Sequence, residues 1–202
     1  MTLQGPRGPE AASFFAALAL CALSAAASAD PAQQFIQPGD IEVAVALDAG
    51  EQSGSANATV RIHAHREVVW SLITSCAEAL SLVPGLVRCE VLETAPDRSW
   101  QRIRHVMNYS WYAPILTYEM RANYVEPSRI SVERVSGDFR ILRGSWSLHS
   151  VGDDTLAHYV VELAPSFWVP KWIVRAALRR DLPKMLRALR ARAETVQNEK
   201  PR

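Results

Sequence analysis

Residues 164–197 read APSFWVPKWIVRAALRRDLPKMLRALRARAETVQ, and this segment decides the fold. Its apolar residues recur mostly at steps of three and four, which places them on one stripe of a helix of about seven turns. They are Trp172, Ile173, Ala176, Ala177, Leu182, Met185, Leu186, Leu189, Ala193 and Val196. The segment therefore predicts one long amphipathic helix whose stripe packs on the rest of the chain.

The other face of this predicted helix is strongly basic, with Asp181 and Glu194 as its acids. Such a face is solvated and can also meet an anionic surface. Pro183 lies in the helix interior, where the missing N–H removes one backbone hydrogen bond, so a kink is expected near Arg179 or Arg180. The basic residues are Lys171, Arg175, Arg179, Arg180, Lys184, Arg187, Arg190 and Arg192.

Upstream of the helix, apolar and polar residues alternate in short runs separated by turn-forming residues, a pattern typical of strands. The predicted strands are 41–47, 58–62, 87–93, 100–110, 114–125, 129–136, 139–151 and 156–163, with short helices at 65–74 and 76–82. Short turns between consecutive strands require antiparallel neighbours. The expected class is therefore α+β, a curved antiparallel sheet that grips one helix.

The N-terminal segment, residues 1–29, predicts a secretory signal peptide. Arg7 precedes an apolar run at 11–27, and Ala27-Ser28-Ala29 forms a small-residue cleavage site before Asp30. An uncleaved anchor is the alternative, and a lipid attached at Cys21 is disfavoured because the preceding residue is Leu. We therefore expect a periplasmic or secreted protein cut after Ala29, with a linker and extra strand at 30–55 and one domain at 56–199.

Removal of the signal would leave Cys76 and Cys89, an even pair in an oxidising compartment. A disulfide between them would stabilise the fold by about 3 kcal/mol, and two buried free thiols are the alternative. The chain has no phosphate loop, no GxSxG elbow and no HExxH helix. With a net charge of +1 and its basic residues crowded into the last helix, it is not expected to bind nucleic acid, a metal or a cofactor.

Several segments resemble the START-like (SRPBCC) superfamily, in particular its branch of polyketide cyclases and coenzyme-Q-binding START domains. They are IHAHREVVWSLIT at 62–74, VPGL at 83–86 and GDFRILRGSWSLHSVGDDTLAHYVVELAP at 137–165. The resemblance covers 56–197 and implies a helix-grip fold, in which a seven-stranded antiparallel sheet curls round the long C-terminal helix and leaves a cavity. Members hold lipids, quinones, sterols or polyketides. Ser75-Cys76 departs from the pattern, and the strand at 41–47 lies outside it.

Alternation along the predicted strands assigns an inner face that is rich in aromatic residues and Met. Gly144 presents no side chain beside Trp146 on this face, which favours a hollow over a filled core. A solid core built from the same residues is the alternative. The predicted ligand-binding residues are His105, Met107, Tyr109, Tyr118, Met120, Trp146, Tyr159, Trp172 and Met185.

We expect the protein to bind or transfer a hydrophobic small molecule and not to be an enzyme. The alternative is a cyclase- or dehydratase-like enzyme in which His105 acts as acid or base and Tyr118 or Tyr159 polarises a carbonyl. Against it, Glu119 alternates outward, so the inner face offers no carboxylate to tune His105. A further alternative is an accessory protein that uses its basic helix on a membrane complex.

The ends of the predicted strands bring the turns at 84–86, 110–113, 137–138 and 166–170 to one end of the sheet. Aromatic residues beside cations are typical of membrane interfaces. Transient membrane contact is therefore expected through Trp111, Phe167, Trp168, Lys171 and Arg175. Alternatively, these loops pack on one another and close the end of the sheet.

Overall fold

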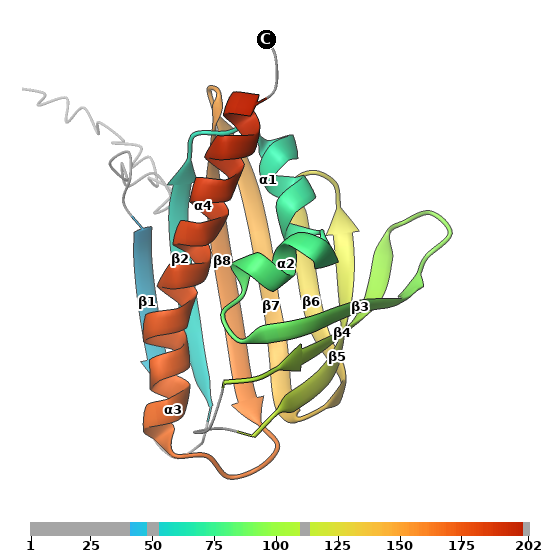
Figure 1. The fold of residues 1–202 in the computed structure, drawn as a ribbon, viewed down its shortest axis with the longest axis vertical. Coiled ribbons are helices and arrows are strands. Elements are labelled where there is room, and N and C mark those ends of the chain that lie inside the picture. Colours follow the sequence, from blue (N-terminus) through green and yellow to red (C-terminus); the bar gives the residue numbers. More distant parts are fainter. Residues whose placement is uncertain (1–40, 48–52, 110–113, 200–202) are drawn as a thin grey trace, which may run out of the picture. The chain divides into compact units, whose positions relative to one another are not determined.

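The computed structural model describes residues 41–47, 53–109 and 114–199, so the expected signal peptide and Trp111 lie outside the described residues. One antiparallel sheet of eight strands has the order β1-β2-β8-β7-β6-β5-β4-β3 (Figure 1). The strands are β1 (Ile41–Leu47), β2 (Gly54–Ile62), β3 (Leu86–Thr94), β4 (Trp100–Met107), β5 (Leu116–Val125), β6 (Arg129–Gly137), β7 (Phe139–Val151) and β8 (Asp154–Pro165).

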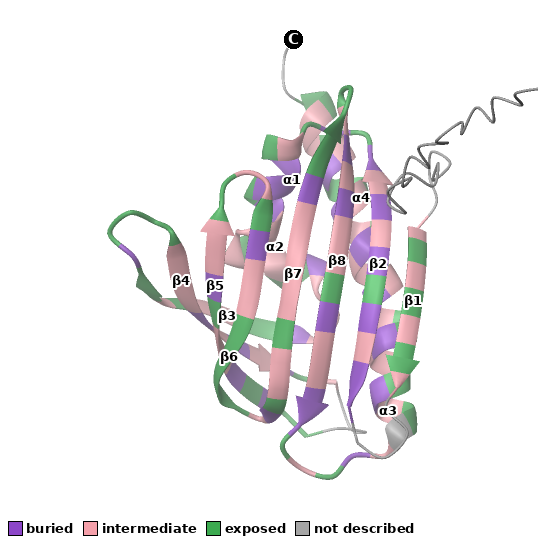
Figure 2. Ribbon diagram, turned by 180° about the vertical axis from the view of Figure 1, so that it is seen from behind, coloured by how far each residue is buried: buried purple, intermediate pink, exposed green. Residues whose placement is uncertain are grey.

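The predicted class is confirmed, and the strand number expected from the resemblance is corrected. The sheet has eight strands instead of seven, because β1 pairs with β2 from Ile41 opposite Val60 to Leu47 opposite Gly54. β1 thus adds an edge strand to the sheet, next to β2. Seen from behind, the strands carry many exposed and half-buried residues, as expected for a sheet covered on one face only (Figure 2).

The long helix runs along the other face of the sheet and consists of α3 (Lys171–Ala176), a π-helical segment (Ala177–Asp181) and α4 (Leu182–Glu199). α4 buries Leu182, Leu186, Leu189 and Ala193, whose spacing places them on one side of the helix. The π-helical segment ends just before Pro183, which cannot donate a backbone hydrogen bond. A π-helical segment therefore occupies the position near Arg179 and Arg180 where the kink was predicted.

The short helices α1 (Arg66–Ile73) and α2 (Cys76–Leu82) lie beside α4 on the same side of the sheet (Figure 1). The Ser75 side chain accepts a hydrogen bond from the Glu78 N–H and caps α2. Cys76 and Cys89 form a disulfide, with 5.3 Å between their Cα atoms, which ties α2 to β3. The Arg192 guanidinium of α4 donates to both carboxylate oxygens of Glu78 at 2.9 and 3.0 Å. The two thiols are thus bonded, and α2 is held from both sides.

The predicted turns at 84–86, 137–138 and 166–170 lie at one end of the sheet, and the predicted turn at 110–113 lies outside the described residues. The Asn108 N–H donates to the Gly85 carbonyl at 2.7 Å, and the Ser166 N–H donates to the Asp138 carbonyl at 2.9 Å. A hydrophobic cluster separate from the main core closes this end, and Phe167 packs against both. The cluster, called the end cluster below, consists of Leu86, Met107, Leu116, Tyr118 and Phe139. Among the described helices, none combines the length and the apolar character needed to span a bilayer.

Candidate functional site

A cavity of about 190 Å³ lies between the sheet, the α1–α2 pair and α4. β4 to β8 contribute inward residues at alternate positions, as the pattern of the sequence predicted. The α1–α2 junction covers one side, and Met185 and Leu189 of α4 line another. The centre of the fold is therefore hollow, and the alternative of a filled core is wrong.

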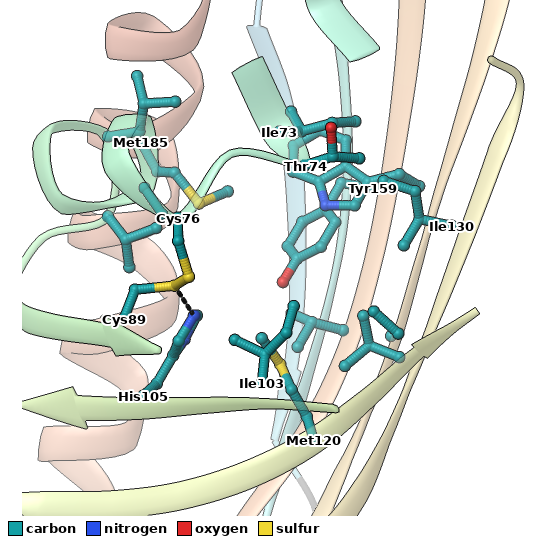
Figure 3. A pocket seen from close by; sticks show the side chains of 18 of the residues that line it. Ile73, Thr74, Cys76, Cys89, Ile103, His105, Met120, Ile130, Tyr159 and Met185 are labelled. Carbon is teal, nitrogen blue, oxygen red and sulfur yellow. Dashed lines mark hydrogen bonds between the residues drawn. A yellow bond between two sulfur atoms is a disulfide. The ribbon is translucent and has the colours of Figure 1, made fainter. Parts of the chain in front are cut away.

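Most of the predicted ligand-binding residues surround this cavity. His105, Met120, Tyr159 and Met185 project into it from different elements (Figure 3). Tyr118 and Trp146 belong to the same lining.

Met107, Tyr109 and Trp172 lie outside the cavity lining. Met107 packs in the end cluster, because β4 ends there and the sheet continues beyond the cavity. Tyr109 and Trp172 border a separate hollow of about 260 Å³ at the start of the long helix, where Trp172 is 61% exposed. Trp172 and Met185 are 13 positions apart, and at about 100° per residue this spacing places them on different faces even of a regular helix.

Other lining residues were not among the predicted ligand-binding residues. Ile130 and Val132 of β6 face the cavity, and their alternation along the strand is a signal that could have identified them. The α1–α2 pair contributes Ile73, Cys76 and Ala79. Apolar spacing predicts these helices but does not say where on a sheet they rest.

His105 forms a neutral, fully paired group with its neighbours. Its Nδ1 lies 3.0 Å from the Tyr118 hydroxyl, and its Nε2 lies 3.3 Å from Sγ of Cys89 (Figure 3). A disulfide sulfur has no hydrogen, so Nε2 is the donor in that contact and Nδ1 accepts from Tyr118. Burial lowers the pKa of His105 to about 4, which leaves the ring uncharged at neutral pH.

The tyrosines of the cavity are also uncharged. Burial raises the pKa of Tyr118, with a smaller contribution from Tyr109 and Tyr159, and burial raises the pKa of Tyr159 to about 12. The Tyr159 ring packs against Trp146 with 4.3 Å between ring centroids. The Tyr118 hydroxyl is engaged with His105, whereas that of Tyr159 has no hydrogen-bond partner among the described residues.

Ionised side chains point away from the cavity. Glu119 faces outward, as predicted, and pairs with Arg104 at 2.7 Å. Arg143 borders the cavity on β7 but turns its side chain to Glu162 on the outer side, at 2.6 Å. Within the described part of the chain, no group of three or more His, Cys, Asp and Glu side chains is placed to hold a metal.

Gly144 lines the cavity beside Trp146, as predicted, and has a second role. A Cβ at this position would lie 2.8 Å from the carbonyl oxygen of Val160 on β8, a distance too short for that contact. The glycine therefore permits close approach of β7 and β8 in addition to leaving space above Trp146.

Solved structures with the same fold include lipid-transfer proteins and enzymes. The STAR-related lipid transfer protein from Xanthomonas axonopodis (19% identity, TM-score 0.64) covers 77% of this chain and 94% of its own. The Zhui aromatase/cyclase from Streptomyces sp. R1128 (16%, TM-score 0.60) covers 70% and 94%. The human StarD13 lipid transfer and protein localization domain (14%, TM-score 0.62) covers 78% and 87%. At these identities the likeness shows the fold alone.

No curated protein matches the chain in a sequence search. A family model described as polyketide cyclase / dehydrase and lipid transport matches residues 62–190, a span that holds the whole cavity lining. The predicted resemblance is therefore confirmed, and the chain belongs to the polyketide cyclase / dehydrase and lipid transport family of the START-like superfamily.

Proposed function

We propose that the protein binds or transfers a hydrophobic small molecule in the cavity between its sheet and its long helix. The observation that carries the proposal is a space of about 190 Å³ lined by Met120, Trp146, Met185 and other apolar side chains. Ligand sites are concave and mostly apolar, with a few polar groups that orient the guest. Both the family and its lipid-transfer neighbours are in keeping with such a role.

The pairing of His105 favours binding over the cyclase-like alternative. A general base works best when its pKa is near the operating pH, and burial lowers the pKa of His105 to about 4. Its Nδ1 lone pair is also occupied by the Tyr118 hydroxyl, 3.0 Å away. An aromatase/cyclase among the structural neighbours keeps the enzymatic alternative worth testing. A substrate turned over by the wild type and not by His105→Gln would establish it.

The proposal includes transient contact with an anionic membrane through the end of the molecule where the long helix begins. Trp168 and Trp172 are 75% and 61% exposed there, which is unusual for Trp, and Arg175 and Arg179 beside them are exposed. Phe167 packs inward instead, together with Leu86 of the end cluster, so this end is partly closed by its own loops. The exposed aromatic residues and cations would meet lipid, and the end cluster would separate them from the cavity.

Export is proposed for the same protein on two grounds. The N-terminal segment has the pattern of a cleavable signal, and the Cys76–Cys89 disulfide is of the kind that persists in oxidising compartments. Mass spectrometry of the mature protein tests this directly, since cleavage after Ala29 would leave Asp30 at the N-terminus.

Native mass spectrometry with organic extraction tests the binding function. Mature protein purified from its own compartment is expected to carry one extractable apolar molecule per chain. Ala122→Leu adds side-chain atoms to the cavity, whereas Val125→Leu, on the same strand but 62% exposed, leaves it unchanged. The ligand should be lost from Ala122→Leu and kept by Val125→Leu. A wild-type protein without any extractable or exchangeable apolar ligand would refute the proposal.

A further inference from the structure

The size of the cavity limits what fits inside it. An apolar cavity of about 150 Å³ in another protein holds one benzene ring. The cavity here measures about 190 Å³. The part of a ligand that lies between the sheet and α4 is therefore about the size of one ring with a short substituent.

The charge of the site limits the ligand further. His105 is neutral at neutral pH because burial lowers its pKa to about 4, and Arg143 is turned outward to Glu162. No described lining residue could therefore pair with a ligand charge, and burial of an unpaired charge is very unfavourable. The buried part of the ligand has to be uncharged.

The polar groups of the sheet define the remaining requirement. His105 and Tyr118 satisfy one another, and the Tyr124 hydroxyl donates to Gln101 at 2.9 Å. Tyr159 and Trp146, which pack against each other, also line the cavity, and their side-chain donors have no partner among the described residues. The Trp146 N–H can only donate, and the Tyr159 hydroxyl can donate as well as accept. Each group has a hydrogen that needs an acceptor, so the ligand has to supply one.

We propose that the cavity selects an uncharged molecule whose ring-sized apolar part carries a carbonyl oxygen, and that this oxygen accepts a hydrogen bond from the Tyr159 hydroxyl beside Trp146. A carbonyl satisfies the donor without adding another, whereas a ligand hydroxyl brings a second hydrogen that needs its own acceptor. This inference rests on the proposed binding function and narrows it to a class of ligand.

A matched pair of probes isolates the carbonyl. Acetophenone and ethylbenzene share one ring and a two-carbon substituent and differ in the carbonyl oxygen, and benzoate adds a charge. Isothermal titration calorimetry on the full chain would compare the wild type, Tyr159→Phe and Tyr124→Phe. Tyr124→Phe is the control, because Tyr124 lines the same cavity but its hydroxyl is committed to Gln101.

Tyr159→Phe is expected to weaken acetophenone binding about fivefold to tenfold and to change ethylbenzene binding less than about twofold. Tyr124→Phe should leave the ratio of the two affinities unchanged, and benzoate should not bind. A second measurement needs no variant: the carbonyl stretch of acetophenone bound to the wild type should lie at lower frequency than in hexane, as for a hydrogen-bonded ketone.

The outcomes separate this inference from the binding function. If both probes bind the wild type, Tyr159→Phe affects them equally and the carbonyl stretch matches that in hexane, the assigned acceptor is wrong while the cavity still binds apolar molecules. If benzoate binds as well as acetophenone, the requirement for an uncharged ligand is wrong. If neither acetophenone nor ethylbenzene binds the wild type, the binding function itself fails.

Discussion

The disulfide between Cys76 and Cys89 is expected to contribute strongly to stability, and its removal is a quantitative test of how the cavity cover is held. The bonded residues are 13 positions apart in the sequence. A cross-link that closes a loop of this length lowers the conformational entropy of the unfolded chain and stabilises the folded one by about 3 kcal/mol.

Other attachments of α2 replace little of this contribution. The Ser75 cap contributes about 1 kcal/mol, and the Arg192–Glu78 pair at 2.9 Å is partly exposed, a setting in which ion pairs contribute about 1 kcal/mol or less. Without the disulfide, α2 is therefore expected to open more often than the sheet and to release a bound ligand faster.

Urea unfolding at neutral pH, followed by far-UV circular dichroism, measures the effect. With a slope of about 1–3 kcal/mol per molar urea, a loss of about 3 kcal/mol lowers the midpoint by about 1–3 M. The comparison is between the oxidised wild type, the wild type in a phosphine reductant and the double variant Cys76→Ser, Cys89→Ser. The reductant should not change the midpoint of the double variant.

Equal midpoints for oxidised and reduced wild type, with complete reduction verified by thiol titration, would refute the reasoning. They would mean that the loop constraint is offset in the folded state and that α2 is held by its packing instead.

Three further predictions concern the burial of His105, the contact of Gly144 with β8, and the exposed Trp residues. Burial lowers the pKa of His105 to about 4, so the unfolded state binds a proton at this residue before the folded state does. The free energy of unfolding should therefore fall between pH 6.5 and pH 4, by about 2 kcal/mol from pH 7 to pH 5. Urea titrations of His105→Leu over the same pH range should lack this decrease. Gly144→Ala places a Cβ 2.8 Å from the Val160 carbonyl oxygen and should lower the free energy of unfolding by about 1–3 kcal/mol. Ser145→Ala on the same strand should have little effect. Equal urea midpoints for the two variants would contradict the close approach of β7 and β8 at Gly144. Trp168→Ala and Trp172→Ala should each reduce partitioning onto anionic vesicles roughly tenfold in flotation assays. Val125→Ala, at the end of β5 that lies away from the end cluster, is the control. Equal partitioning of all variants would contradict the membrane proposal.

Strand faces could be predicted from the sequence because side chains alternate with a period of two, whatever the neighbouring strands are. Arg104 and Glu119 lie outside and His105 and Tyr118 lie inside for this reason alone. The family resemblance added what alternation does not supply, namely that the sheet curls round the helix and leaves a space.

Features that depend on tertiary contacts could not be predicted in the same way. The α1–α2 cover is positioned by the disulfide and by the pairing of Glu78 with Arg192, which are 114 residues apart. Gly144 was identified for the space it leaves, but its close contact with Val160 depends on how β7 meets β8.

A crystal of the protein under xenon pressure tests most directly whether a vacant apolar space lies between the sheet and α4. Xenon enters dry apolar cavities. An ordered xenon atom is expected between Met120, Trp146 and Met185, with Ala122→Leu showing reduced occupancy. Side chains packed through this region, with no xenon bound in the wild type, would contradict the presence of an internal ligand site.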